Sequence, residues 1–225
     1  MKTELIVALD VGDIKKAKKL AEVLRPAVKF FKVGSFLFTS CGPDIVRWLK
    51  QKRLKVFLDL KLFDIPNTVA STAKAITGMG VSMFTIHASG GQEMIRACAE
   101  AVKAEARRLK IEKPKIIAVT VLTSSNPRDV KAQVSQLARQ ALEAGADGLV
   151  CSVQEAQMLR RKFSNNTILV CPGIRLASAT SADQKRVATP KDAKKAGADF
   201  IVVGRPIIEA DSALRAAVDI ARLLK

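Results

Sequence analysis

Two carboxylates and a lysine stand close together in one short stretch of the chain. Asp59 and Lys61 lie at the end of an apolar run, and Asp64 follows shortly after. Side chains of a β-strand alternate between its two faces, so Asp59 and Lys61 are predicted to share one face. The opposite face is then left to three leucines, Leu58, Leu60 and Leu62. The charged group can supply an acid, a base and an electrostatic partner at one site; the alternative is a solvated ion pair on an edge strand.

Further charged residues stand at the ends of other predicted strands. Asp10 ends the first strand pattern and Lys32 lies near the end of the second, and with Asp59 and Lys61 they form an alternating series of carboxylates and ammonium groups. Opposite charges at short range keep one another ionised in a partly dry site. Such a series also creates a field in which an anionic transition state is favoured over its ground state.

Two segments near the C-terminus are typical of a phosphate site. Gly204 and Arg205 end the last predicted strand, and Pro172 and Arg175 follow the strand before it. Glycine lets a phosphate approach the backbone, and a guanidinium can bind it through two parallel hydrogen bonds. In barrels of alternating strands and helices, the loops after strands seven and eight form the usual phosphate site.

The polar segment 176–189 contains no strand pattern. We expect it to act as a mobile lid, because Gln184, Lys185 and Arg186 are available there to close on an anion. The alternative is a disordered surface loop without a function.

Strand-like and helical patterns alternate along the whole chain. Short apolar runs predict eight strands, at Leu5–Asp10, Phe30–Gly34, Val56–Lys61, Met83–Ala88, Ile116–Leu122, Gly148–Ser152, Ile168–Pro172 and Phe200–Gly204. Amphipathic stretches predict helices near Ile14–Leu24, Asp44–Gln51, Asn67–Gly78, Gly91–Leu109, Asp129–Glu143, Gln154–Arg161, Thr189–Ala196 and Ser212–Leu224. Near-continuous apolar strands are typical of a parallel sheet covered on both faces.

Eight such units without a low-complexity linker favour one α/β domain over residues 1–225, a single (β/α)₈ TIM barrel. A doubly wound open sheet is the alternative. The barrel is favoured because polar residues gather at or just after the strand ends, where barrel enzymes carry their active sites. These residues are Asp10, Lys32, Lys61, His87, Thr123, Ser152, Arg175 and Arg205.

Several other kinds of site are excluded by the sequence. His87 is the single histidine, which cannot by itself build a zinc site, and we interpret it as a hydrogen-bonded residue of the barrel mouth. No dinucleotide fingerprint follows the first strand, and no nucleophile elbow is present. The four cysteines are widely spaced, which favours reduced, mostly buried thiols in a cytoplasm over disulfides or zinc. No apolar run is long enough for a transmembrane helix, and the N-terminus is predicted to be a strand, not a signal peptide.

The formal net charge of +17 is the main anomaly of the composition. Nucleic-acid binding, attraction of an anionic small substrate and a lineage-wide basic bias compete to explain it. The basic residues fall in short clusters spread over several predicted helices, which favours ordinary solvated helix faces. Weak, salt-sensitive binding of polyanions would follow from this charge whatever the function.

Together, these segments resemble orotidine 5′-monophosphate decarboxylases of the bacterial type, and the resemblance covers essentially the whole chain. Asp59–Thr68 carries D-x-K-x-x-D, which a wider group of phosphate-binding barrels shares, followed by the more specific I-P-N-T. No motif position departs from the family pattern. The matching segments are Ala8–Asp10, Phe31–Gly34, Asp59–Thr68, Leu122–Ser124, Pro172–Arg175, Asp183–Arg186 and Val203–Pro206.

The resemblance implies a lyase that converts orotidylate to UMP and carbon dioxide without metal or cofactor. Lys61 would protonate C6 of the pyrimidine as the carboxylate leaves, and Asp59 would lie against that carboxylate. Lys32 would bridge Asp59 and a ribose hydroxyl, and Asp10 would accept a hydrogen bond from the ribose. The catalytic residues would be Lys61, Asp59, Asp64 and Lys32.

The resemblance also implies where the rest of the substrate binds. Thr123 would bind the pyrimidine edge, and the phosphate would be held by Arg175, Gln184, Gly204 and Arg205. Asp64 and Thr68 would reach the ligand of a partner in a homodimer, so that a monomer should be inactive. The full set of substrate-binding residues would be Asp10, Lys32, Asp59, Leu60, Lys61, Leu62, Phe63, Asp64, Ile65, Pro66, Asn67, Thr68, Thr123, Pro172, Arg175, Gln184, Gly204 and Arg205.

Two other functions compete with this interpretation. Magnesium-dependent 3-keto-gulonate-6-phosphate decarboxylases and hexulose-phosphate synthases share D-x-K-x-x-D, but are not expected to carry the I-P-N-T and D-Q-K-R segments. A basic nucleic-acid-binding protein on an old barrel would explain the charge, but gains little from an intact series of carboxylates and lysines. The expected partners are therefore a small substrate and a second copy of the chain, with no specific nucleic acid and no membrane.

Overall fold

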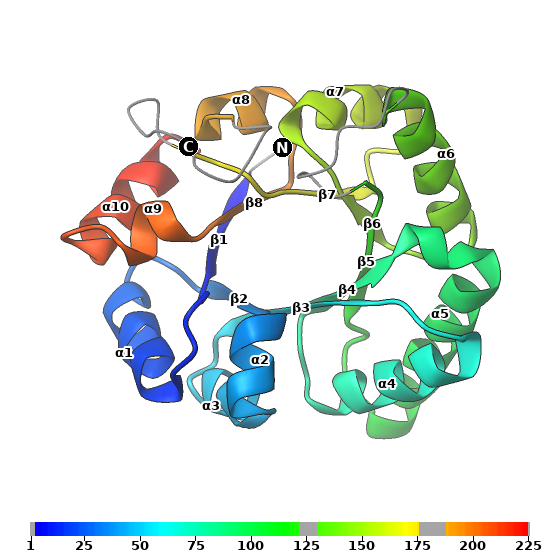
Figure 1. Cartoon of the computed structure of the whole chain (residues 1–225), viewed down its shortest axis with the longest axis horizontal. Coiled ribbons are helices and arrows are strands. Elements are labelled where there is room, and N and C mark those ends of the chain that lie inside the picture. The colour runs from blue at the N-terminus through cyan, green and yellow to red at the C-terminus, as the bar shows by residue number, and fades with distance from the viewer. Residues whose placement is uncertain (1–2, 122–129, 176–187, 225) are drawn as a thin grey trace.

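A computed structural model of the chain describes residues 3–121, 130–175 and 188–224. Its strands form one closed, parallel barrel in the order β1-β2-β3-β4-β5-β6-β7-β8, and β8 pairs back onto β1 (Figure 1). This confirms the predicted (β/α)₈ barrel. The strands are β1 Glu4–Ala8, β2 Phe30–Gly34, β3 Lys55–Leu62, β4 Met83–His87, β5 Lys115–Val119, β6 Gly148–Val150, β7 Ile168–Cys171 and β8 Phe200–Val203.

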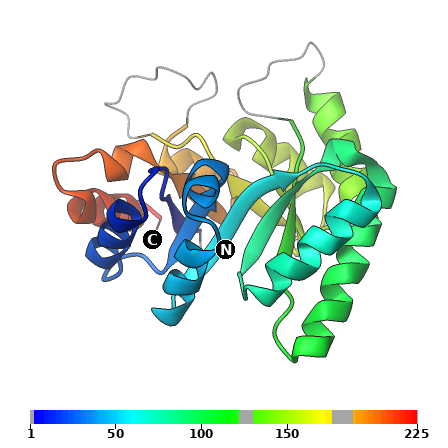
Figure 2. The same ribbon diagram turned by 60° about the horizontal axis from the view of Figure 1, so that its bottom comes forward.

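Helices surround the ring of strands (Figure 2). They are α1 Ile14–Leu24, α2 Ser35–Cys41, α3 Asp44–Gln51, α4 Pro66–Gly78, α5 Gly91–Leu109, α6 Val130–Glu143, α7 Val153–Lys162, α8 Pro190–Lys195, α9 Arg205–Ile208 and α10 Ala213–Arg222, with a 3₁₀ turn at Ala88–Gly90. The helices α2 and α9 were not predicted, because both are too short to show a helical period in the sequence. None of the helices in the described part of the chain is long and apolar enough to cross a membrane.

The apolar core has two layers, and the strands alternate between them. Ile6 and Phe57 belong to the layer inside the barrel, whereas Leu5, Val7 and Leu58 belong to the layer between strands and helices. Both faces of each strand are therefore buried, which explains why the strands are almost continuously apolar in sequence. Leu60 and Leu62 pack against the outer layer with Leu58, as the alternation predicted.

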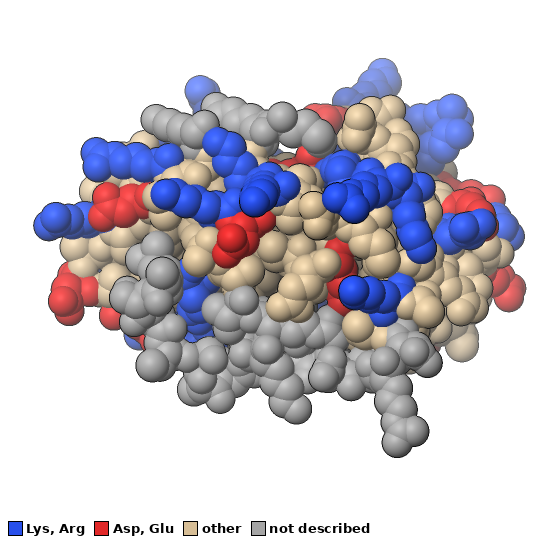
Figure 3. Space-filling model, turned by 90° about the horizontal axis from the view of Figure 1, so that it is seen from above, with Lys and Arg blue, Asp and Glu red and all other residues tan. Residues whose placement is uncertain are grey.

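Lys and Arg side chains are prominent on the side of the molecule that carries α7 and α8 (Figure 3). Arg160, at the end of α7, differs from the solvated helix-face residues that the sequence suggested. Its guanidinium donates to the carbonyl oxygens of Gly197 at 2.8 Å and Thr167 at 2.9 Å, and it pairs with Asp199 at 2.7 Å. Asp199 in turn accepts from the backbone N–H of Leu169. Arg160 therefore joins α7 to the loops that lead into β7 and β8.

The cysteines are free thiols, and Cys98, Cys151 and Cys171 are buried while Cys41 is partly buried. Burial raises the pKa of Cys98 to about 12, so this thiol stays protonated at neutral pH. The expectation of mostly buried thiols is confirmed.

Candidate active site

The predicted series of carboxylates and lysines forms a continuous chain of contacts at the carboxyl ends of β1, β2 and β3. The Lys32 ammonium lies 2.9 Å from an Asp10 oxygen and 3.6 Å from one oxygen of Asp59. The other oxygen of Asp59 lies 2.8 Å from the ammonium of Lys61. Asp59 is thus held between two lysines, and each lysine faces a carboxylate. We call Asp10, Lys32, Asp59 and Lys61 the charged array, or simply the array.

The end of β3 departs from regular strand geometry at the lysine. Lys61 has φ of 52°, in the left-handed region, and the β3–β4 register shifts between Leu58 and Leu62. A left-handed residue that is not glycine is uncommon, and such strain often marks a functional site. The bend is supported by Thr85 of β4, whose hydroxyl accepts from the backbone N–H of Lys61 at 2.8 Å and donates to Asp59 at 3.0 Å.

The charges of the array determine the protonation state of Asp59. Burial, the largest single influence, would raise the pKa of this carboxyl group, and the charges of Lys32 and Lys61 act against it. Hydrogen bonds from Lys61 and Thr85 act in the same direction, so the pKa of Asp59 lies below its ordinary value of 3.8. Asp59 is therefore an ionised carboxylate at neutral pH.

Gly34 leaves room for the array at the end of β2. A Cβ atom at this position would lie 2.9 Å from the Lys32 ammonium and 3.4 Å from an Asp10 oxygen. A larger residue would require the end of the Lys32 side chain to shift. The short Lys32–Asp10 contact therefore depends on a glycine here.

The array lines one side of a cavity of about 410 Å³ at this end of the barrel. Cavities that hold small ligands commonly have volumes in this range. The other side belongs to the ends of β7 and β8, and apolar side chains from inside the barrel form the floor. The lining residues are Ala8, Asp10, Lys32, Phe57, Asp59, Lys61, Val150, Val170, Pro172, Gly173, Arg175, Val202, Gly204, Arg205 and Glu209.

The predicted phosphate segments border the same cavity at the ends of β7 and β8, next to Asp10 on the β1 side. Gly204 immediately precedes α9, which begins at Arg205, and Arg175 follows β7. Arg175 is fixed in part by its backbone N–H, which donates to the carbonyl oxygen of Ala188 at 3.0 Å. Both arginines border the cavity, so it combines two guanidinium groups at one end with the lysines at the other. This distribution suits an elongated anion.

The remaining predicted residues lie outside this cavity or outside the described structure. Leu60 and Leu62 pack toward the helices, as noted above, and Pro66 is partly exposed. Exposed side chains follow β3 at Phe63, Asp64, Ile65, Asn67 and Thr68. Thr123 and Gln184, together with Lys185, Arg186 and most of the expected lid, lie outside the described residues.

Two polar residues predicted at strand ends have other roles. The Ser152 hydroxyl accepts from the backbone N–H of Glu155 and caps α7, so it does not line the cavity. The rings of His87 and Phe63 meet edge to face, with their centroids 5.8 Å apart. The His87 side chain has no hydrogen bond to any residue in the described ranges. Burial, and next the charge of Lys61, lower the pKa of His87 in spite of the opposing Asp59, so the imidazole is neutral at pH 7.

Several residues of the site were not identified from the sequence. Thr85 is an ordinary polar residue within a strand, and its contact with Asp59 depends on the β3–β4 register, which no local pattern specifies. Glu209 follows the short helix α9, which was itself not predicted. Within the described ranges, no cluster of three His, Cys, Asp or Glu side chains is suited to hold a metal ion.

Fold and site together define a barrel protein with a charged cavity at the carboxyl ends of its strands, where barrel enzymes place their active sites. Comparison with known proteins agrees with this class. The profile of the orotidine 5′-phosphate decarboxylase / HUMPS family matches residues 3–220. The chain therefore belongs to this family.

Individual relatives match over nearly the full length of the chain. An orotidine 5′-phosphate decarboxylase of Carboxydothermus hydrogenoformans is 49% identical over 221 residues, which cover 94% of this chain and 92% of the relative. The enzyme of the same name from Coxiella burnetii is 43% identical over 222 residues, with 95% and 93% covered. The crystal structure of orotidine 5′-phosphate decarboxylase from Lactobacillus acidophilus superposes with a TM-score of 0.87 at 38% identity, covering 99% of both chains.

Proposed function

We propose that the protein is an orotidine 5′-phosphate decarboxylase, which forms UMP and carbon dioxide in the de novo synthesis of pyrimidines. The observation that carries the proposal is the Asp59–Lys61 pair, 2.8 Å apart at the wall of a cavity whose far side carries Arg175 and Arg205. The names of the relatives support the substrate, because the two relatives match over 95% and 94% of this chain.

Lys61 acts as the proton donor in this proposal. The bond between C6 of the pyrimidine and its carboxylate breaks, the electron pair stays on C6, and carbon dioxide leaves. The Lys61 ammonium stabilises the developing negative charge and transfers a proton to C6. Asp59 stays ionised and holds the Lys61 ammonium in place through their ion pair until that step. The proposed reaction uses neither a metal nor a cofactor, because the Lys61 ammonium supplies both the charge stabilisation and the proton.

The other lining residues position the substrate. Lys32 and Asp10 face the ribose hydroxyls, and Pro172, Arg175, Gly204 and Arg205 surround the phosphate. A phosphate held far from C6 supplies binding energy that can orient the pyrimidine against Lys61. We also assign Thr123 to the pyrimidine edge and Gln184 to closure over the phosphate.

A homodimer with shared active sites is part of the proposal. Phe63 and Ile65 flank Asp64 and are 63% and 66% exposed, and Phe36 at the same end of the barrel is 61% exposed. Large exposed apolar side chains of this kind favour an interface. A second copy of the chain would cover these side chains. Asp64 and Thr68 would then contact the substrate bound in that second copy, and the rest of Asp59–Thr68 would contribute to the shared active sites. The free thiols support a reducing, cytoplasmic location.

The fall in ultraviolet absorbance as orotidylate is consumed tests the proposal, in parallel reactions with and without EDTA. We expect conversion to UMP at equal rates in both. Loss of activity with EDTA, together with decarboxylation of 3-keto-gulonate 6-phosphate, would instead assign the protein to the metal-dependent members of the family.

A further inference from the structure

A second cavity lies at the opposite end of the barrel from the active site. It has a volume of about 620 Å³ and is lined by residues at the amino ends of several strands, among them Phe30 of β2, Met83 of β4 and Phe200 of β8. Residues at the amino ends of barrel strands usually serve the stability of the fold, whereas active sites lie at the carboxyl ends. The residues that line this cavity, however, are suited to bind a ligand.

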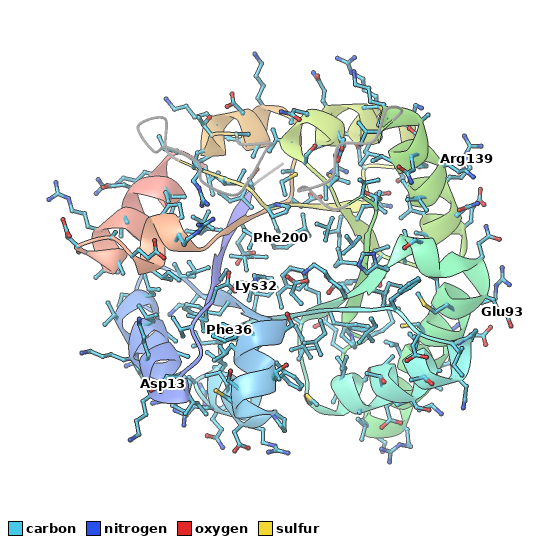
Figure 4. All side chains as sticks on the ribbon, in the orientation of Figure 1. Asp13, Lys32, Phe36, Glu93, Arg139 and Phe200 are labelled. Atoms are coloured by element: carbon cyan, nitrogen blue, oxygen red, sulfur yellow. The ribbon has the colours of Figure 1, made fainter. Side chains whose placement is uncertain are left out.

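The inner wall of the cavity is apolar and includes two aromatic rings. Phe30 and Phe200 meet edge to face, with their ring centroids 5.6 Å apart, and Phe200 lies within the ring of strands (Figure 4). Ile168 continues this wall, and Ile111 at its border is 41% exposed. The cavity thus offers ring edges and aliphatic surface to a flat apolar group.

Four lysines surround this apolar wall. Lys113 lies 2.9 Å from Asp147, which also lies 3.9 Å from the ammonium of Lys115. One carboxylate therefore serves two lysines. Glu112 also lines the cavity and is exposed.

The other two lysines are held less tightly. The Lys55 ammonium lies 3.5 Å from Glu4 and 5.6 Å above the ring of Phe30. Lys50 has no ion-pair partner within the described ranges, and its Cε lies only 3.7 Å from where a Cβ of Gly80 would stand. The Lys50 stem therefore extends along the border of the cavity with its ammonium group uncompensated.

We propose that this cavity is a second ligand site, for a small anion that carries a flat aromatic ring. The ring packs against the partly exposed Phe200 and Ile168, which lie next to the buried Phe30, and the anionic group meets Lys50 and its lysine neighbours. The anion adds negative charge to a cavity where Lys55 pairs with Glu4, Lys113 and Lys115 share Asp147, and Lys50 has no ion-pair partner within the described ranges. Aromatic sulfonates, carboxylates and nucleotides share this chemistry. The proposal does not depend on the activity at the other end of the barrel.

Titration of the full chain with 1-anilinonaphthalene-8-sulfonate, followed by fluorescence and by the amide NMR signals of Gly80 and Ser82, tests this site. We expect saturable binding that shifts both signals, with inorganic sulfate or the uncharged N-phenylnaphthylamine binding more weakly than the sulfonate. Competition by 2-naphthoate and by adenosine 5′-monophosphate then distinguishes simple aromatic acids from nucleotides.

Variants decide whether the binding belongs to this cavity. Lys50→Glu should weaken binding about tenfold, since a favourable contact becomes a repulsive one, and Lys50→Gln should weaken it less. The control Lys19→Glu makes the same charge change on an exposed position of α1, and Arg175→Ala alters the active-site cavity; neither should change the affinity more than about twofold. Absence of saturable binding, unchanged affinity in both Lys50 variants, or loss of binding in Arg175→Ala would overturn the proposal.

Discussion

Asp59 is the residue on which the charges of the candidate active site depend. It accepts from Lys61 and Thr85 through one oxygen and faces Lys32 with the other. Removing its charge would leave two ammonium groups near each other without the carboxylate that they share. We therefore expect Asp59 to stabilise the folded protein as well as to take part in the reaction.

The pH dependence of stability follows from the lowered pKa of Asp59. A carboxyl group whose folded pKa lies below its unfolded value stabilises the fold at higher pH, and this contribution is lost as the pH falls through the folded pKa. The stability difference between the wild type and Asp59→Asn should be constant near neutral pH and should shrink only below the ordinary value of 3.8. Urea unfolding of both proteins at several pH values measures it.

The matched control for this experiment is Asp211→Asn. Asp211 is exposed, so its variant should follow the wild type at every pH. A stability difference between wild type and Asp59→Asn that begins to shrink near neutral pH would contradict the lowered pKa.

At the scale of residues, the sequence identified the charged members of the site but not what orients them. Asp10, Lys32, Asp59 and Lys61 could be predicted because strand ends converge at one face of a barrel. Thr85 could not, because its contact crosses two strands whose register shifts at that point. The roles given to individual residues on the basis of the family resemblance stay predictions.

At the scale of elements, Arg160 shows that a basic cluster on a helix need not be a solvated face. Its side chain is only 13% exposed and satisfies backbone carbonyl groups as well as Asp199. Its sequence neighbours Arg161 and Lys162 suggested one common role, although only Arg160 lies toward the β7 and β8 loops. Sequence clustering alone could not distinguish them.

Replacement of Arg160 by alanine should therefore destabilise the fold. The change leaves Asp199 and the carbonyl groups of Gly197 and Thr167 without their partly buried partner, and a hydrogen bond to a charged group typically contributes about 2 kcal/mol. Arg161→Ala, at an exposed position one residue further, should change the free energy of unfolding by less than about 0.5 kcal/mol. Urea unfolding of the two variants provides the comparison, and equal effects would refute the structural role of Arg160.

Most elements were predictable because the barrel repeats one unit. Buried strands and amphipathic helices alternate, and their order alone limits the topology. The short helices α2 and α9 escaped prediction because each lacks enough residues to show a period. Both lie at the active-site end, where the loops vary and carry function.

At the scale of the whole molecule, the proposed dimer makes a quantitative prediction. Lys61→Ala and Asp64→Asn should each inactivate a homodimer, but a hybrid dimer contains one site with Lys61 from one chain and Asp64 from the other. Random exchange makes half of the dimers hybrid, so about a quarter of the wild-type activity should return. The decarboxylation rate after mixing measures this recovery.

Subunit exchange must be verified in the same mixture, for example by energy transfer between labelled chains. The mixture of wild type with Lys61→Ala serves as the control, because its activity should simply follow the fraction of wild-type chains. Complete exchange without any recovery in the mixture of the two variants would show that the sites are not shared.

The measurement that tests the account most directly is the rate of orotidylate conversion by purified wild type and Lys61→Ala in the presence of EDTA. The account predicts complete conversion to UMP by the wild type and a rate at least about 100-fold lower for the variant, within the range that a lost proton donor commonly produces. Circular dichroism should show the same fold for both. A folded, dimeric wild type that leaves orotidylate unchanged, or a Lys61→Ala variant that converts it as fast, would contradict the central claim.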